Sequence, residues 1–163
     1  MSAPTWTSHD IFARLRALDI PLPERVQAQG GYALASVHGG IAYTSGQLPR
    51  LDSTGGIISG CLAAGDSLEL AHQAARLCFA RALLALHQEL GDLARLERLL
   101  FLRGFVNARP DFAKHGAVMD AASDLAITLF GESGRHGRSA LGVSSLPAGG
   151  LVEIELVAAV RGA

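Results

Sequence analysis

The sequence GRHGRSALGVSSLPAGGLVEIELVAAV, residues 134–160, contains the pattern that decides the fold class of this chain. Two apolar segments, 139–145 and 151–160, flank the turn sequence LPAGG, so we predict two strands. In the second strand, a period of two places Glu153 and Glu155 on one face. The opposite face takes three aliphatic residues, Val152, Ile154 and Leu156. This strand therefore has one face suited to a core and one that carries carboxylates.

Arg138 and Glu153 are the candidate functional residues of this stretch, because each stands near the start of a predicted strand. On spacing alone, the alternative is an ordinary solvated strand face for the glutamates and an ion-paired or solvated arginine. The spacing of these two residues leaves both interpretations open.

The rest of the chain alternates between helical and strand-like patterns. Outward from residues 134–160 we predict a helix over 111–130, a strand over 95–107, a helix over 67–90, strands over 32–37 and 41–45, and a helix over 8–18. Ser8 and Asp66 are the expected N-caps of the first and the longest helix. The glycines of HGG, residues 38–40, suit a tight hairpin turn. This order of elements indicates one α+β domain, with the helices packed on one face of a mixed sheet.

The composition favours a self-associating protein without a polyanionic partner. Of the 163 residues, 49% are hydrophobic and 18% are charged, which leaves few polar groups to cover the surface of a monomer. The formal net charge is −1, and Lys114 is the sole lysine, so the chain lacks the basic footprint of a nucleic-acid-binding protein. We therefore expect no nucleic-acid partner.

Several chemistries have no motif in the sequence. Cys61 and Cys78 form no C-x-x-C pair, and the six histidines show no ligand spacing, so we expect neither a disulfide nor a metal site. Ser45 lies outside any G-x-S-x-G elbow, and neither a P-loop nor a dinucleotide fingerprint occurs. The first twenty residues lack the pattern of a signal peptide, and no apolar run reaches 18 residues. We expect a cytoplasmic protein with no membrane contact.

Two motifs together resemble the RidA/YjgF family, also labelled endoribonuclease L-PSP, with a chorismate-mutase-like fold. They are YTSGQLP at residues 43–49 and RSALGVSSLPAGGLVEIE at residues 138–155. The resemblance covers about residues 30–160, taken as the RidA/YjgF-like domain 30–163. Residues 1–29 then form an N-terminal helical extension, as in one subgroup of the family.

The resemblance implies a homotrimer whose sheets form a barrel-like centre, with helices outside and clefts between subunits. It also implies an activity without a cofactor. In such clefts, small reactive 2-imino or enamino acids are hydrolysed to 2-keto acids and ammonia. The alternatives are a non-catalytic trimer that binds a small carboxylate-bearing metabolite, or an endoribonuclease of the L-PSP type.

The same resemblance implies roles for individual residues. Arg138 would clamp the substrate carboxylate, and Glu153 would activate the attacking water. Tyr32 and Ser45 would line the pocket.

Two positions depart from the pattern of active members. Ala140 replaces a Cys or Thr, and Asp120 stands where the second helix of those members carries Asn. An anion near Arg138 would compete with a bound carboxylate.

Overall fold

The structure is a computed structural model that describes residues 6–51 and 56–162. Its elements are α1 (Ser8–Ala17), β1 (Ala35–His38), β2 (Ile41–Thr44), α2 (Glu69–Leu90), β3 (Leu96–Asn107), α3 (His115–Phe130), β4 (Gly137–Val143) and β5 (Val152–Val160). Short 3-10 turns, η1 (Leu93–Arg95), η2 (Gly131–Gly134) and η3 (Pro147–Gly149), connect some of them. The predicted helices and strands are therefore present in the predicted order.

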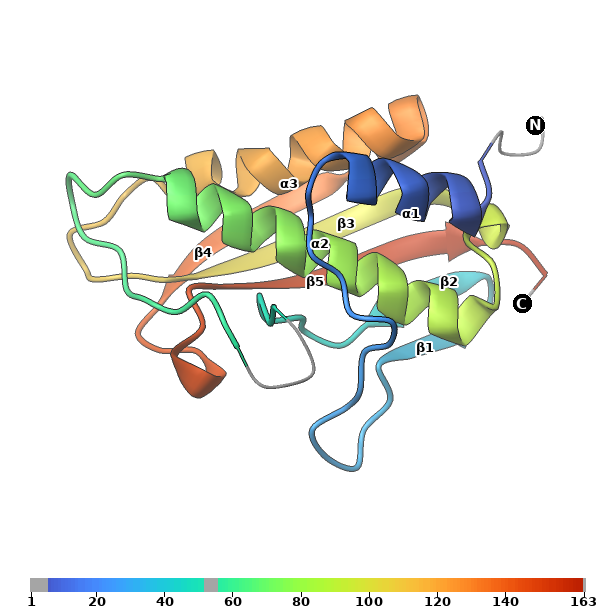
Figure 1. The fold of residues 1–163 in the computed structure, drawn as a ribbon, viewed down its shortest axis with the longest axis horizontal. Coiled ribbons are helices and arrows are strands. Elements are labelled where there is room, and N and C mark those ends of the chain that lie inside the picture. Colours follow the sequence, from blue (N-terminus) through green and yellow to red (C-terminus); the bar gives the residue numbers. More distant parts are fainter. Residues whose placement is uncertain (1–5, 52–55, 163) are drawn as a thin grey trace.

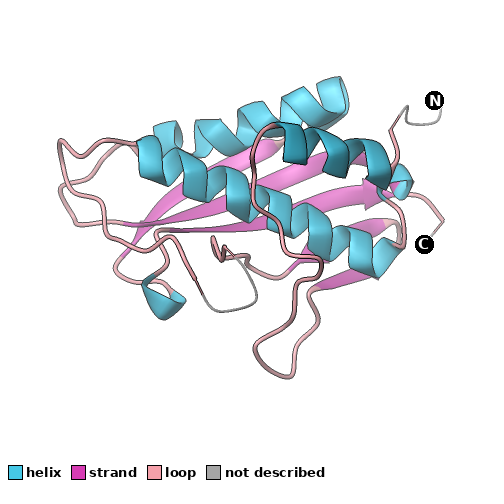
Figure 2. Cartoon of the chain, in the orientation of Figure 1, coloured by secondary structure: helices cyan, strands magenta, loops and turns pink. Residues whose placement is uncertain are grey.

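The strands form one mixed sheet in the order β1-β2-β5-β3-β4. All neighbouring strands are antiparallel except β3 and β4, which are parallel and are joined through α3. The helices lie in one layer over one face of the sheet (Figures 1 and 2). This confirms the predicted α+β architecture and leaves β4 as an edge strand.

The core lies between the sheet and the helices. Leu77 and Leu83 of α2 are buried against the sheet side that includes Leu102 and Leu156. The burial of β5 alternates strictly along the strand, as the period of two predicts. The hairpin turn between β1 and β2 is also confirmed, because Gly39 and Gly40 both have positive φ angles of 57° and 77°.

Helix α1 packs into the main core. Ile11 and Leu15 are fully buried in the same cluster as the residues of α2. On the partly exposed side, Arg14 Nη1 donates a hydrogen bond of 3.1 Å to the carbonyl of Leu129, near the end of α3. The helix thus contributes to the domain's core, while the boundary at residue 29 stays a prediction.

Both predicted N-caps were wrong. Thr7 caps α1 by accepting from the Asp10 amide, and Ser8 lies inside the helix. Asp66 Oδ2 instead accepts from the Ala63 amide at 2.8 Å, so α2 begins at Glu69 without a side-chain cap.

Three predicted boundaries also shift. Helix α3 begins at His115 because the residues from position 111 form a turn, in which Phe112 donates to the Arg109 carbonyl. β1 begins at Ala35, which leaves Tyr32 in the preceding loop. β4 begins at Gly137 and therefore includes Arg138.

Candidate functional site in two parts

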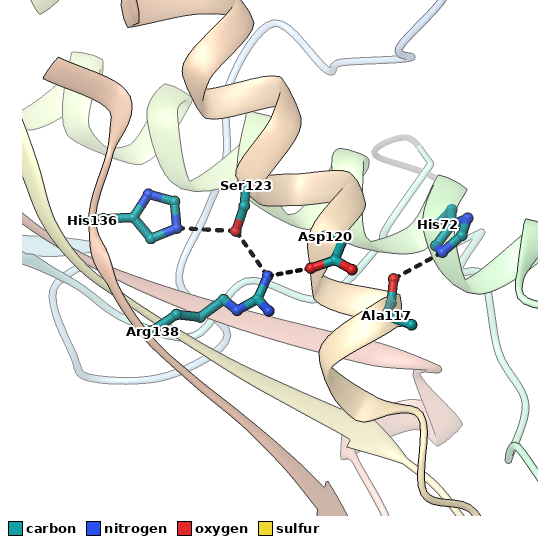
Figure 3. Close-up of polar contacts among 6 residues, drawn as sticks. All are labelled: His72, Ala117, Asp120, Ser123, His136 and Arg138. Atoms are coloured by element: carbon teal, nitrogen blue, oxygen red, sulfur yellow. Dashed lines mark hydrogen bonds and ion pairs between the residues drawn. The ribbon is translucent and has the colours of Figure 1, made fainter. Parts of the chain in front are cut away.

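Arg138 lies on the helix-covered face of the sheet, beneath α3 (Figure 3). Arg138 pairs with the buried residue Leu102 of β3, so the side chains of both residues lie on the same face of the sheet. Arg138 Nη1 donates to Asp120 Oδ1 at 2.9 Å and to Ser123 Oγ at 3.0 Å. The Arg138 side chain is 27% exposed, whereas that of Asp120 is 60% exposed. The site is therefore open on the Asp120 side.

His136, just before β4, extends this polar cluster. Its Nε2 lies 3.1 Å from Ser123 Oγ, and its Nδ1 lies 2.6 Å from the carbonyl oxygen of Gly134. Burial lowers the pKa of His136, the Gly134 hydrogen bond acts in the opposite direction, and the charge of Arg138 lowers it further. At neutral pH the imidazole is therefore uncharged.

Small residues surround the guanidinium of Arg138. Ala140 shares its face of β4, because its register partner is Gly104. At Gly116 of α3, a Cβ atom would stand 3.7 Å from Arg138 Nη2, which is ordinary contact distance. The absence of a side chain there leaves space beside Nη2. His72 of α2 holds this end of α3 through the Ala117 carbonyl, 3.0 Å from Nε2 (Figure 3).

Glu153 lies on the opposite, open face of the sheet. Its register partner on β3 is Phe105, and its neighbours along β5 turn toward the helices. The carboxylate rests against Gly46, where any Cβ atom would overlap it. Burial raises the pKa of Glu153, and the nearby charge of Glu155 adds to the effect. Glu153 therefore holds its proton to a higher pH than an exposed glutamate.

Ser45 lies next in sequence to the glycine that contacts Glu153, and it is hydrogen-bonded to the loop that contains Tyr32. Ser45 directly precedes Gly46, and its Oγ donates a 2.6 Å hydrogen bond to the carbonyl of Ala33. Tyr32, the residue before Ala33, is 51% exposed, and its hydroxyl accepts from the Gln29 amide at 3.3 Å. The Ser45 side chain is thus hydrogen-bonded to the loop that contains Tyr32.

The predicted site residues therefore fall into two groups. Asp120 and Ala140 lie with Arg138 under α3, whereas Ser45 and the Tyr32 loop lie on the Glu153 side. Within one chain, the sheet separates the two groups.

Sequence reasoning missed Ser123, His136 and Gly116. Spacing in the sequence points to the first two of these residues, since Ser123 follows Asp120 by one helical turn and His136 precedes Arg138 by one strand period.

Within residues 6–51 and 56–162, no group of three His, Cys, Asp or Glu side chains is placed to hold a metal ion. Over the same residues, no helix is both long and apolar enough to cross a membrane.

The fold defines a single-domain α+β protein with one helical layer, and the candidate site residues are divided between the two faces of its sheet. The family model described as "YjgF/chorismate_mutase-like, putative endoribonuclease" matches residues 12–160. Protein TCP17 of Trypanosoma cruzi is 38% identical over 146 residues, which make up 89% of this chain and 91% of that protein. The chain therefore belongs to the YjgF/chorismate-mutase-like family.

Solved structures agree with this assignment. Protein Atu1372 from Agrobacterium tumefaciens, of unknown function, superposes with a TM-score of 0.85 at 34% identity, covering 94% of both chains. A Shewanella oneidensis protein described as a "putative endoribonuclease" gives a TM-score of 0.82 at 33% identity, covering 92% of this chain and 99% of that one.

Proposed function

We propose that this protein is a homotrimeric deaminase that hydrolyses small reactive 2-imino or enamino acids to 2-keto acids and ammonia, without a cofactor. The observation that carries the proposal is the division of the site. A cation suited to a carboxylate and a carboxylate suited to activating water are present, but on opposite faces of one sheet. A cleft between two copies brings such groups together.

Arg138 supports the binding of an acid. Among the described residues, its hydrogen bonds come from Nη1, which leaves Nη2 and Nε for a ligand. These two groups form one edge of the planar guanidinium and match the two oxygens of a carboxylate. Gly116 and Ala140 leave room for the ligand beside that edge.

Glu153 supports the activation of water. In the proposed reaction, water attacks C2 of the protonated imine while the carboxylate takes a proton from that water, which leaves a C2 hydroxyl and a neutral amine. Glu153 returns this proton to the amine, so ammonia leaves as the C–N bond breaks, and the C2 hydroxyl loses its proton to solvent as it becomes the keto oxygen. A base whose pKa is raised is better matched to this proton transfer than an exposed glutamate is.

The open face of the sheet supports association between copies. Tyr43 and Leu141, on strands β2 and β4, are 53% and 48% exposed. Tyr43 pairs with Val157 of β5, and Leu141 pairs with Phe105 of β3, which in turn pairs with Glu153. Both side chains therefore lie on the face opposite the helices. Large exposed apolar side chains on one face are typical of an interface.

The Arg138 ion pair favours a second candidate, a trimer that binds a metabolite without converting it. Asp120 already occupies Nη1 at 2.9 Å, and its negative charge competes with the carboxylate of any ligand. A site of this kind could bind an acid weakly and lack the geometry for turnover.

Ammonia release from freshly generated 2-iminopropanoate separates the two candidates. We expect the protein to accelerate release above the rate in buffer, and Arg138→Ala to abolish the acceleration. Wild-type protein that binds pyruvate but leaves the rate unchanged would establish the binding function instead. An RNA-cleavage assay on the same preparation tests the description of relatives as endoribonucleases. We expect no cleavage, since acidic residues slightly outnumber basic ones, 15 to 14.

A further inference from the structure

Three polar contacts connect the backbone of η2 to the guanidinium of Arg138. They run from the Gly134 carbonyl to His136 Nδ1, from His136 Nε2 to Ser123 Oγ, and from Ser123 Oγ to Arg138 Nη1. Their lengths are 2.6, 3.1 and 3.0 Å. Figure 3 shows Ser123 on α3 between Arg138, which lies on β4, and His136, which lies just before that strand. None of these contacts takes part in the proposed reaction.

The chemistry of the groups fixes the direction of each hydrogen bond. A carbonyl oxygen accepts only, so His136 Nδ1 carries the hydrogen in its contact with Gly134. In the neutral ring, Nε2 is then an acceptor, and the Ser123 hydroxyl must donate to it. With its hydrogen directed at His136, Ser123 Oγ turns its lone pairs toward Arg138 Nη1. The ring thus orients the hydroxyl as an acceptor.

We propose that Ser123 and His136 are positioning residues that hold Arg138 ready for a carboxylate ligand. This inference rests on the proposed role of Arg138 in binding the substrate acid. Ser123 fixes Nη1 on the side away from the open edge, so that Nη2 and Nε keep their orientation when no ligand is bound.

Asp120 cannot supply this function equally well. It is a charged and largely exposed partner, so a bound carboxylate repels it and competes with it for the guanidinium. Ser123 is neutral and half-buried, so it holds Nη1 without cancelling the charge that attracts the ligand. Arg138 therefore retains one fixed partner when Asp120 is displaced.

The charges around His136 set the expected pH dependence. Arg138 is the charged group that acts on it from β4, and Asp120 of α3 lies on the far side of that guanidinium. Beside η2, Arg135 pairs with Glu132 in solvent, and Arg98 of β3 donates to the Arg135 carbonyl. Protonation of His136 adds a positive charge next to Arg138, and Nε2 then donates to Ser123 Oγ, whose second lone pair still accepts from Arg138 Nη1. A carboxylate should therefore bind more tightly as the pH falls through the pKa of His136, which burial holds below the ordinary value of 6.5.

Isothermal titration with pyruvate tests the positioning role, on variants that are first shown to remain trimeric and thermally stable. Loss of one hydrogen bond in Ser123→Ala should weaken pyruvate binding about 3- to 10-fold, and Ser123→Thr, which keeps the hydroxyl, should restore it. His136→Phe keeps the ring but loses the acceptor, so it should cost about 2- to 4-fold and remove the tightening at low pH. Thr128→Ala, at an exposed position of the same helix, is the matched control and should bind like wild type.

Nitrogen NMR of His136 in the wild-type protein gives a second readout that needs no variant. We expect a neutral ring with its hydrogen on Nδ1 at pH 7. A hydrogen on Nε2, or Ser123→Ala binding pyruvate as well as wild type does, would overturn the positioning role while leaving the proposed function intact. Wild-type protein that neither binds pyruvate nor releases ammonia would overturn both.

Discussion

Arg138 shares one nitrogen, Nη1, between partners of different charge, Asp120 and Ser123. The sequence pointed to Arg138 through a motif, and to Asp120 as a competing anion if the two shared a cleft. The structure shows that they are in contact. The helical and strand spacings place Ser123 beside Asp120 and His136 beside Arg138, but they do not show that the helix and the strand are in contact.

Substitutions at Arg138 and Asp120 should have opposite effects on carboxylate binding. If Arg138 forms a bidentate, charge-assisted pair with the ligand, Arg138→Ala should cost about 2 to 4 kcal/mol, roughly 30- to 1,000-fold in affinity. Asp120→Asn should strengthen binding because it removes the competing anion. Isothermal titration with pyruvate and 2-oxobutanoate measures both changes. An Arg138→Ala trimer with unchanged affinity would make Arg138 a structural ion-pair residue.

Glu153 should determine the acid limb of the pH profile. A general base works only when deprotonated, and burial raises the pKa of Glu153 above the ordinary value of 4.5. The kcat/KM should therefore rise with pH through this raised pKa, and Glu153→Gln should lower it roughly 100- to 10,000-fold.

Glu155→Gln is the matched control on the same strand face. Glu155 binds Arg103 at 2.7 Å and raises the pKa of Glu153. Its removal should preserve turnover and shift the acid limb to lower pH. A limb that stays in place in Glu153→Gln, with turnover retained, would assign the base to another group.

At the scale of elements, periodicity predicted the type of each helix and strand but not where each begins. The alternating pattern of β5 and the broad apolar face of α2 match the burial seen in the structure, because the apolar side chains of both elements pack into the core. The helix starts were misplaced because capping side chains have competing partners, as the contact of Asp66 with the Ala63 amide illustrates. The strand order, with β5 between β2 and β3, depends on long-range pairing that no local pattern encodes.

Helix α1 is attached to the domain through Ser8, which is 8% exposed. Its hydroxyl contacts Asp92 Oδ1 at 2.8 Å and accepts from the buried Leu93 amide at 2.7 Å. Ser8→Ala leaves that amide without its partner, so we expect a loss of about 1 to 3 kcal/mol in the free energy of unfolding.

Denaturant unfolding at fixed protein concentration measures this loss. The exposed residue Ser144 provides the control, and Ser144→Ala should change stability little. Equal stability of the two variants would show that the Ser8 hydroxyl does not help to hold α1 on the domain.

At the scale of the whole molecule, an open sheet face with exposed tyrosine and leucine leads us to expect a trimer in dilute solution. Light scattering coupled to gel filtration should give about three times the chain mass of 17.0 kDa. A single-chain mass at micromolar concentration would exclude any site shared between copies.

In the proposed deaminase, Arg138 of one copy works with Glu153 of another, and trimers assembled from two variants test this pairing. Arg138→Ala and Glu153→Gln chains, each inactive alone, are co-expressed with different tags, and trimers that contain both are isolated. If neighbouring copies share each site, every mixed trimer contains one complete site, and ammonia release from 2-iminopropanoate should recover to about a third of the wild-type rate. Mixed trimers that remain as inactive as either parent, although correctly assembled, would contradict the shared site.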